Sequence, residues 1–292
     1  MRWDEQCVTT EPALPVASED WVQFNIAPSR GDAGRVSARP LLDGLTHRLA
    51  QWRESGEVLC WFIRKPPGLR LRLGGGGFGA GARADLRSLL DHERERRRIE
   101  GWHQGRYEPE LHRLGGATML PTVHALFSAD TDVWLAWCAL RDRGGNKLSA
   151  QWMSLASYGD LVLQGTEATE EAWDVWAELH RVYAGTPPQA PSPDLGSNRL
   201  GSAGLQSLAS PQEAQLIGDA VATNARFVTV MRQHAEGGGL VGGPRSLLAT
   251  LACFYWNRWG VASEACATLC AAMSQDLHPY LAFESLLPDA SA

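Results

Sequence analysis

Lysine is scarce in this sequence: only Lys65 and Lys147 are lysines among the 27 basic residues. With 33 acidic residues the formal net charge is −6, which argues against general nucleic-acid binding. Long hydrophobic runs are missing too. The most apolar stretch, near Leu247–Trp256, is far shorter than the roughly 20 residues needed to cross a bilayer. The sequence therefore predicts neither a nucleic acid nor a membrane as a partner.

Cysteine motifs are also missing. The six cysteines include no Cys-x-x-Cys pair, and Cys266 and Cys270 have no histidine or carboxylate at a spacing that would complete a zinc site. Most lie in apolar sequence, so we expect buried free thiols in a reducing compartment. The N-terminal segment has no basic region followed by an apolar core, so no secretory signal is expected. These features predict a cytoplasmic protein that binds no metal.

Familiar catalytic motifs are absent as well. The sequence has no Gly-x-Ser-x-Gly, no zinc-binding helix and no kinase signature. The glycine run Gly74–Gly77 is not followed by the Gly-Lys-Ser/Thr of a phosphate-binding loop. It is interpreted as a flexible loop, with a mobile flap over a site as the alternative. The eight histidines are scattered, which is typical of hydrogen-bonded structural residues.

The segment from Glu57 to Leu73, EVLCWFIRKPPGLRLRL, has the clearest structural pattern. Its first half, Val58–Ile63, is apolar on both alternating faces, as is typical of a central strand buried on both sides. Lys-Pro-Pro-Gly then predicts a turn, because proline lacks the backbone donor that a strand ladder needs. The second half alternates, so we expect Arg70 and Arg72 on one face and three leucines on the other. Two neighbouring guanidinium groups indicate a site for an anion or a polar peptide.

The remaining pattern predicts an α+β fold, with a small, largely antiparallel sheet in the N-terminal half packed with a mostly helical C-terminal half. Further strands are expected at Trp21–Ala27 and, with weaker alternation, at Ile99–Tyr107. We expect a loose arm at residues 1–20, a single domain over 21–292 and a long loop at 186–210. Helical spacing of apolar residues predicts helices at 35–55, 82–98, 120–128, 130–142, 147–159, 167–184, 211–234, 246–259 and 261–277.

Charged residues gather after the last predicted strand. The segment Tyr107–Gly116 predicts a short helical turn in which Glu110 and Arg113, three residues apart, share a face. A local ion pair is the simpler interpretation, and a functional pair is the alternative.

The helix predicted at 246–259 carries polar residues on an otherwise apolar surface. Ser246, Cys253 and Asn257 fall on one face, whereas Tyr255 is turned about 200° from Cys253. Asn257 and Arg258 stand at the C-terminal end, where they either satisfy free carbonyls or bind a partner.

Several segments, in this order, resemble the small elimination domain of lantibiotic dehydratases, which also occurs alone in thiopeptide biosynthesis. FIRKPPGLRLRL carries the resemblance most strongly. The others are WVQFNIAP, YEPELHRLGG, MLPTVHALFSADTD, LSAQWMSLASYGDLVL and SLLATLACFYWNRWG. In the dehydratases this domain removes glutamate from glutamylated serine or threonine of a peptide. By position, the residues of the family's motifs fall on Arg70, Arg72, Glu110, Arg113, Asn257 and Arg258.

One position departs from the eliminating members of the family. They carry a histidine four residues before the motif's asparagine, where this sequence has Cys253. Histidine suits proton transfer near neutral pH, so the elimination base is missing. The departure resembles the thiopeptide pyridine synthases, which join two dehydroalanines of a thiazole-containing peptide in a formal aza-Diels–Alder cycloaddition. Water and the leader peptide then leave.

The resemblance implies a ribosomally made precursor peptide as partner, further biosynthetic enzymes beside it, and no cofactor. Positioning two parts of one peptide can supply about 7 kcal/mol or more of the barrier. The candidates for proton transfer are Tyr255, Ser246, Glu110 and His112. The residues expected to hold the peptide are Arg70, Arg72, Arg113, Trp61, Asn257 and Arg258. Two alternatives stay open: a glutamate-eliminating subunit with another base, and a non-catalytic peptide-binding subunit.

Overall fold

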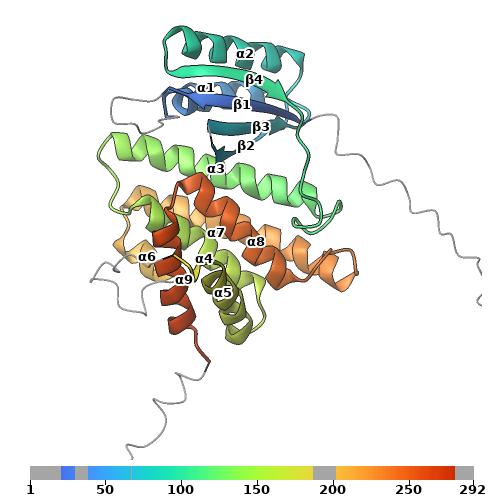
Figure 1. Ribbon diagram of the computed structural model, residues 1–292, viewed down its shortest axis with the longest axis vertical. Coiled ribbons are helices and arrows are strands. Elements are labelled where there is room, and N and C mark those ends of the chain that lie inside the picture. The colour runs from blue at the N-terminus through green and yellow to red at the C-terminus, as the bar shows by residue number, and fades with distance from the viewer. Residues whose placement is uncertain (1–20, 30–38, 67, 187–201, 280–292) are drawn as a thin grey trace, which may run out of the picture.

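The computed structural model describes residues 21–29, 39–66, 68–186 and 202–279. The strands are β1 (Val22–Pro28), β2 (Leu59–Lys65), β3 (Gly68–Gly74) and β4 (Ile99–Gly105). The helices are α1 (Arg39–Arg53), α2 (Ala80–Glu95), α3 (Leu120–Asp142), α4 (Ala150–Gly165), α5 (Thr169–Tyr183), α6 (Ser202–Leu208), α7 (Pro211–Glu236), α8 (Pro244–Trp259) and α9 (Ser263–Asp276). The sheet lies with α1 and α2 at one end of the molecule, and α3 runs between it and the other helices (Figure 1). The predicted α+β class is confirmed.

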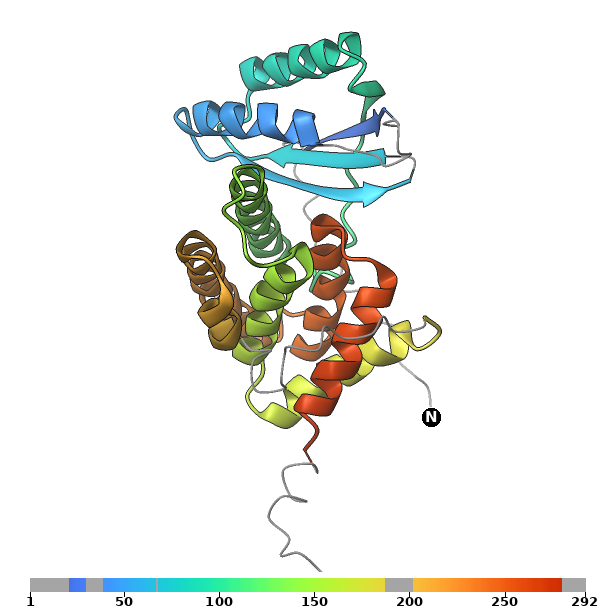
Figure 2. The ribbon, with the colours of Figure 1, turned by 90° about the vertical axis from the view of Figure 1, so that its left-hand side faces the viewer.

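The four strands form one antiparallel sheet in the order β2-β3-β1-β4. Side chains alternate between its two faces, as in any strand. On the apolar face, Ile26 of β1 pairs with Trp102 of β4, whose indole nitrogen donates to Asp91 of α2 over 3.2 Å. Helices α1 and α2 therefore cover this face, on the side away from the large helical layer (Figure 2). The opposite face is polar and carries Arg70 and Arg72, as predicted.

Strand β2 is an edge strand, not the central strand that its apolar sequence predicted. Its burial comes from helices instead, because α3 and α8 pack along it. Hydrogen bonds from a helix also satisfy the free edge of β2 at one residue. The Asn257 amide accepts from the Arg64 backbone N–H over 2.6 Å and donates to the Arg64 carbonyl over 2.8 Å. Asn257 thus replaces a neighbouring strand at that residue.

The helical half differs from expectation in several details. Helix α4 ends at Gly165 rather than at residue 159. Residues 120–142 form one continuous helix rather than two, because the buried polar residues Ser128 and Asp130 have partners within the core and do not interrupt it. Residues 202–208, within the range predicted as a loop, form α6. The predicted N-terminal arm and residues 187–201 of that loop lie outside the described residues. Among the described residues, no helix combines the length and the hydropathy that crossing a membrane requires.

Glu213, in the first turn of α7, joins this helix to the loop before α4. Its side chain is 0% exposed, and its two oxygens accept hydrogen bonds from the backbone of Lys147, Leu148 and Ser210, the Ser210 hydroxyl and the Trp137 indole. Desolvation alone would raise the pKa of this carboxyl. The hydrogen bonds from Ser210, Lys147 and Leu148 outweigh it and lower the pKa below its usual value near 4.5.

Replacing this carboxylate, as Glu213→Gln, is expected to cost about 3 kcal/mol of unfolding free energy at pH 7, because buried donors lose a charged acceptor. Since the folded-state pKa is lowered, the stabilisation is fully present above about pH 4.5 and disappears as pH falls through the folded-state value. Urea unfolding at several pH values should show the gap between wild type and variant closing in acid. Glu236→Gln, exposed on the same helix, is the control, and an equal loss in both variants would contradict this account.

Candidate functional site

The segment between β4 and α3 carries an exposed ion pair. Arg113 Nη1 donates to Glu110 Oε2 over 2.8 Å, and both side chains are exposed. The turn ends as predicted at Gly115 and Gly116, which have φ values of +83° and +95°. Only glycine adopts such values without strain, so the chain reverses here into α3.

Arg113 lines a cavity of about 540 Å³ between this turn, α5 and α8. Ser246, Thr250 and Cys253 of α8 form one wall, because residues four and seven apart share a helix face. Ser246 and Cys253 are exposed to the cavity. Partial desolvation of the sulfur in the cavity wall is the largest influence on the Cys253 thiol and raises its pKa, although Arg113 opposes this. Cys253 is therefore a neutral thiol near pH 7.

A buried arginine lies next to this region. Arg72 is 7% exposed, and its guanidinium stacks on the rings of Trp61 and Tyr107, 4.3 and 4.5 Å from their centroids. Desolvation lowers the pKa of Arg72 to about 10, so it remains a cation at neutral pH. Behind it, Tyr107 Oη lies 2.8 Å from His124 Nε2. Burial, with the nearby Arg72, lowers the pKa of His124 to about 3, so this histidine is neutral.

These charges form one neighbourhood. The pKa of Arg72 responds to the charges of Arg70 and Glu110, and that of Cys253 responds to Glu110 and Arg113. A row of groups from the sheet to α8 therefore shares one electrostatic environment. Asp174 and Glu178, which also line the α8 cavity, pair with Arg245 and Arg181. The guanidinium groups of Arg72 and Arg113 remain suited to carbonyl oxygens or anions of a ligand.

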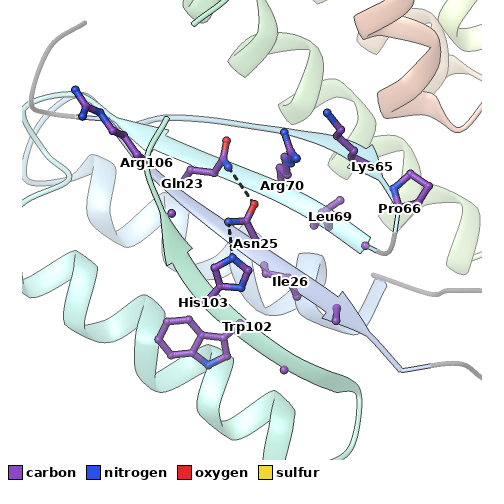
Figure 3. Close-up of a pocket in the computed structure, with 14 residues that line it drawn as sticks. Gln23, Asn25, Ile26, Lys65, Pro66, Leu69, Arg70, Trp102, His103 and Arg106 are labelled. Carbon is purple, nitrogen blue, oxygen red and sulfur yellow. Dashed lines mark hydrogen bonds between the residues drawn. The ribbon is translucent and has the colours of Figure 1, made fainter. Parts of the chain in front are cut away.

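The polar face of the sheet holds a second cavity of about 610 Å³ (Figure 3). Arg70 lines it with residues from all four strands and from the turn between β2 and β3. Arg70 is half-buried and Lys65 is exposed. The structure thus separates the two predicted arginines, because Arg70 reaches an open cavity and Arg72 is enclosed.

The residues predicted for proton transfer lie in different places. Ser246 lines the α8 cavity, and Glu110 reaches its edge through its ion pair with Arg113. His112 is exposed on the same turn but does not line the cavity. Tyr255 is 2% exposed and packs in the core on the far side of α8, so its position does not match the catalytic role expected of it.

Three residues predicted to hold the peptide have structural partners instead of open surface. The Asn257 amide is occupied by the Arg64 backbone. Arg258 is 0% exposed and paired with Asp130. Trp61 is also 0% exposed, so it acts by stacking on Arg72 rather than by lining a cavity. The geometry therefore does not support direct ligand contact by these residues.

Sequence reasoning did not single out Tyr107, His124, Gln23 or Asn25 as site residues. Gln23 accepts a hydrogen bond from Arg72 Nε over 2.9 Å, so it positions the guanidinium. The polar positions of β1 were visible as an alternating pattern, but their partners were not. The contact between Tyr107 and His124 joins a turn to a helix, and no local spacing signals it.

The two strand arginines should respond differently to substitution. Arg70→Gln is expected to change the unfolding free energy by less than about 0.5 kcal/mol, because the side chain is partly exposed. Arg72→Gln should cost about 1–3 kcal/mol, because it removes two ring contacts and leaves Gln23 without its donor. Urea unfolding followed by circular dichroism compares them directly. Equal losses would contradict the different burial of the two side chains.

The family model described as "Lantibiotic biosynthesis dehydratase C-term" matches residues 21–277. Comparison of the sequence with curated proteins gives no significant match.

Solved structures that share the fold include a dehydratase and a pyridine synthase. One is the tRNA-dependent lantibiotic dehydratase MibB from Microbispora sp. 107891, with a TM-score of 0.64 and 16% identity over 92% of this chain. This chain spans 29% of the dehydratase chain. The other is TbtD, the pyridine synthase from thiomuracin biosynthesis, with a TM-score of 0.61 and 15% identity. That match covers 91% of this chain and 100% of the pyridine synthase.

Proposed function

Because the chain belongs to the family of lantibiotic biosynthesis dehydratase C-terminal domains, we propose that it modifies a ribosomally made precursor peptide as a pyridine synthase. The reaction would join two dehydroalanines of a thiazole-containing peptide in a formal aza-Diels–Alder cycloaddition. Loss of water and of the leader peptide would then aromatise the new ring and leave a macrocycle.

The observation that carries this proposal is Cys253. The eliminating members of the family are expected to have a histidine base at this position. Cys253 does line the α8 cavity, but burial raises the pKa of its thiol, so it holds its proton near pH 7. A neutral thiol is a poor general base compared with imidazole. This chain thus has a cavity at that position, but Cys253 is poorly suited to abstract a proton from a glutamylated residue.

The remaining groups suit a reaction that depends on positioning and hydrogen bonding. Ser246 offers a hydroxyl donor to the amide oxygen that must take an iminol-like form during cycloaddition. Glu110, at the edge of the cavity, is placed to accept or return a proton when water and the leader leave. Arg113 holds carbonyl oxygens of the core peptide, and Arg72 stiffens the nearby sheet through its ring contacts.

The test is incubation of the purified protein with a synthetic leader–core peptide that contains two dehydroalanines. Release of the leader as a separate product, with a core fragment that has lost water, is the expected mass-spectrometric result. An unchanged peptide would overturn the proposal. In that case loss of glutamate from a glutamylated peptide would identify an eliminating subunit, and binding without a change in mass would identify a non-catalytic one.

A further inference from the structure

The charged side chains around the cavity on the polar face of the sheet are positive. Lys65, Arg70 and Arg106 line it, and none of the described residues around it is a carboxylate. None of these three cations forms an ion pair with another described residue. Such a surface occurs in a chain whose net charge is −6, so the local charge opposes the overall one. Unneutralised cations around one cavity indicate an anionic ligand.

A chain of hydrogen bonds crosses the same face (Figure 3). Arg72 Nε donates to Gln23 Oε1 over 2.9 Å, and Gln23 Nε2 donates to Asn25 Oδ1 over 3.0 Å. Asn25 Nδ2 then lies 3.0 Å from His103 Nε2. The side chains come from β3, β1 and β4, so the chain spans three adjacent strands.

The direction of this chain follows from its first member. A guanidinium has donors only, so Gln23 must present its oxygen to Arg72 and its NH₂ group to Asn25. The same logic makes Asn25 present its NH₂ group to His103. His103 Nε2 therefore accepts, and the neutral ring carries its hydrogen on Nδ1. The donors of Arg72 thus fix the tautomer of His103 through this series of hydrogen bonds.

We propose that this sheet face is the docking site for an acidic, extended segment of the peptide partner, with Lys65, Arg70 and Arg106 binding its carboxylates and His103 donating from Nδ1. The inference rests on the proposed function in taking a peptide as the partner, and it adds which stretch of peptide binds and where. Alternate side chains of an extended peptide lie roughly 7 Å apart, so acidic residues at every second position can all reach a sheet face.

A peptide fits this face better than RNA does. Single-stranded nucleic acid usually binds where exposed aromatic rings let its bases stack. Trp102 is among the residues that line the cavity. Its side chain lies on the apolar face of the sheet, and its indole nitrogen donates to Asp91. The face thus supplies charge and hydrogen bonds, which match carboxylates on a peptide chain.

The binding test uses the full chain and a fluorescein-labelled synthetic peptide in which glutamate alternates with alanine. Anisotropy at low salt is expected to show binding that weakens as salt is added. The same peptide with glutamine in place of glutamate should bind at least about tenfold more weakly, because charge-assisted hydrogen bonds are lost. Equal binding of both peptides would overturn the proposal, and so would a short RNA that displaces the acidic peptide.

Matched variants locate the site. Lys65→Gln and Arg70→Gln should each raise the Kd of the acidic peptide about threefold to tenfold. Lys147→Gln, on an exposed loop of the helical half, and Arg226→Gln, exposed on α7, should leave it unchanged. A similar loss in all four variants would mean non-specific attraction and would contradict the assignment. These peptides contain no dehydroalanine, so the outcome is independent of whether the protein forms a pyridine ring.

The tautomer of His103 gives a separate test of the hydrogen-bond chain. Nitrogen-15 chemical shifts should assign the Nδ1–H tautomer to His103 in the wild type. Gln23→Ala interrupts the chain and should give a mixture of tautomers, with weaker binding of the acidic peptide. A dominant Nε2–H tautomer in the wild type would overturn the proposed direction of the chain.

Discussion

The Asp130→Ala variant is expected to lose about 3–5 kcal/mol of unfolding free energy, because it leaves a buried arginine without its counter-charge. Arg258 Nε donates to Asp130 Oδ2 over 2.6 Å, and the two side chains are 0% and 2% exposed. Trp259 Nε1 donates to the other carboxylate oxygen over 2.9 Å. The alanine variant removes both acceptors at once and leaves their donors in the buried core.

The other two nitrogens of the Arg258 guanidinium do little to offset this loss of unfolding free energy. Its Nη1 and Nη2 have no hydrogen-bond partner among the described residues. The group lies over the rings of Phe127 and Tyr255, 4.5 and 5.2 Å from their centroids. Ring faces stabilise a cation modestly, by about 1–2 kcal/mol, so Asp130 carries most of the compensation.

Urea unfolding followed by circular dichroism measures the loss. Glu178→Ala removes the exposed ion pair with Arg181 and should cost less than about 1 kcal/mol, which makes it the matched control. The double variant Asp130→Leu with Arg258→Met should recover most of the stability, because an apolar pair of similar size needs no compensation. A loss below about 1 kcal/mol for Asp130→Ala would show that the charge is not confined to the core.

The second large effect is expected on turnover. Ser246→Ala should lower kcat for leader release by about a hundredfold, which is typical of removing one donor to a developing charge. The side chain is exposed in the α8 cavity, so the variant should keep the unfolding free energy of the wild type within about 0.5 kcal/mol.

Two further variants show whether the hydroxyl itself is needed. Ser246→Thr keeps the donor and should recover part of the rate. Ser207→Ala, exposed on α6, should have no effect on kcat. A wild-type rate for Ser246→Ala, or a change confined to KM, would contradict a role in the reaction.

The hairpin could be predicted from the sequence because its determinants are local. Proline and glycine mark the turn, and alternation places Arg70 and Arg72 opposite the leucines. The position of β2 in the sheet could not be predicted in this way. Burial of an edge strand by α3 and α8 gives the same apolar sequence as burial between two strands.

For the site, too, local contacts could be predicted from the sequence and distant contacts could not. Helical periodicity correctly placed Ser246 and Cys253 on one face of α8 and turned Tyr255 away from them. It could not show that Asn257, on the face shared with Ser246, would pair with the backbone of Arg64, because 193 residues separate the two. The enclosure of Arg72 by Tyr107 and Trp61 likewise depends on how the turn after β4 folds back.

The most direct test of the proposed function is a competition between two substrates in one incubation. One peptide carries a leader and two dehydroalanines, and the other carries a glutamylated serine in the same sequence context. The account predicts release of the leader and a dehydrated macrocyclic core from the first peptide, while the second keeps its glutamate. Loss of glutamate from the second peptide, with the first unchanged, would contradict it.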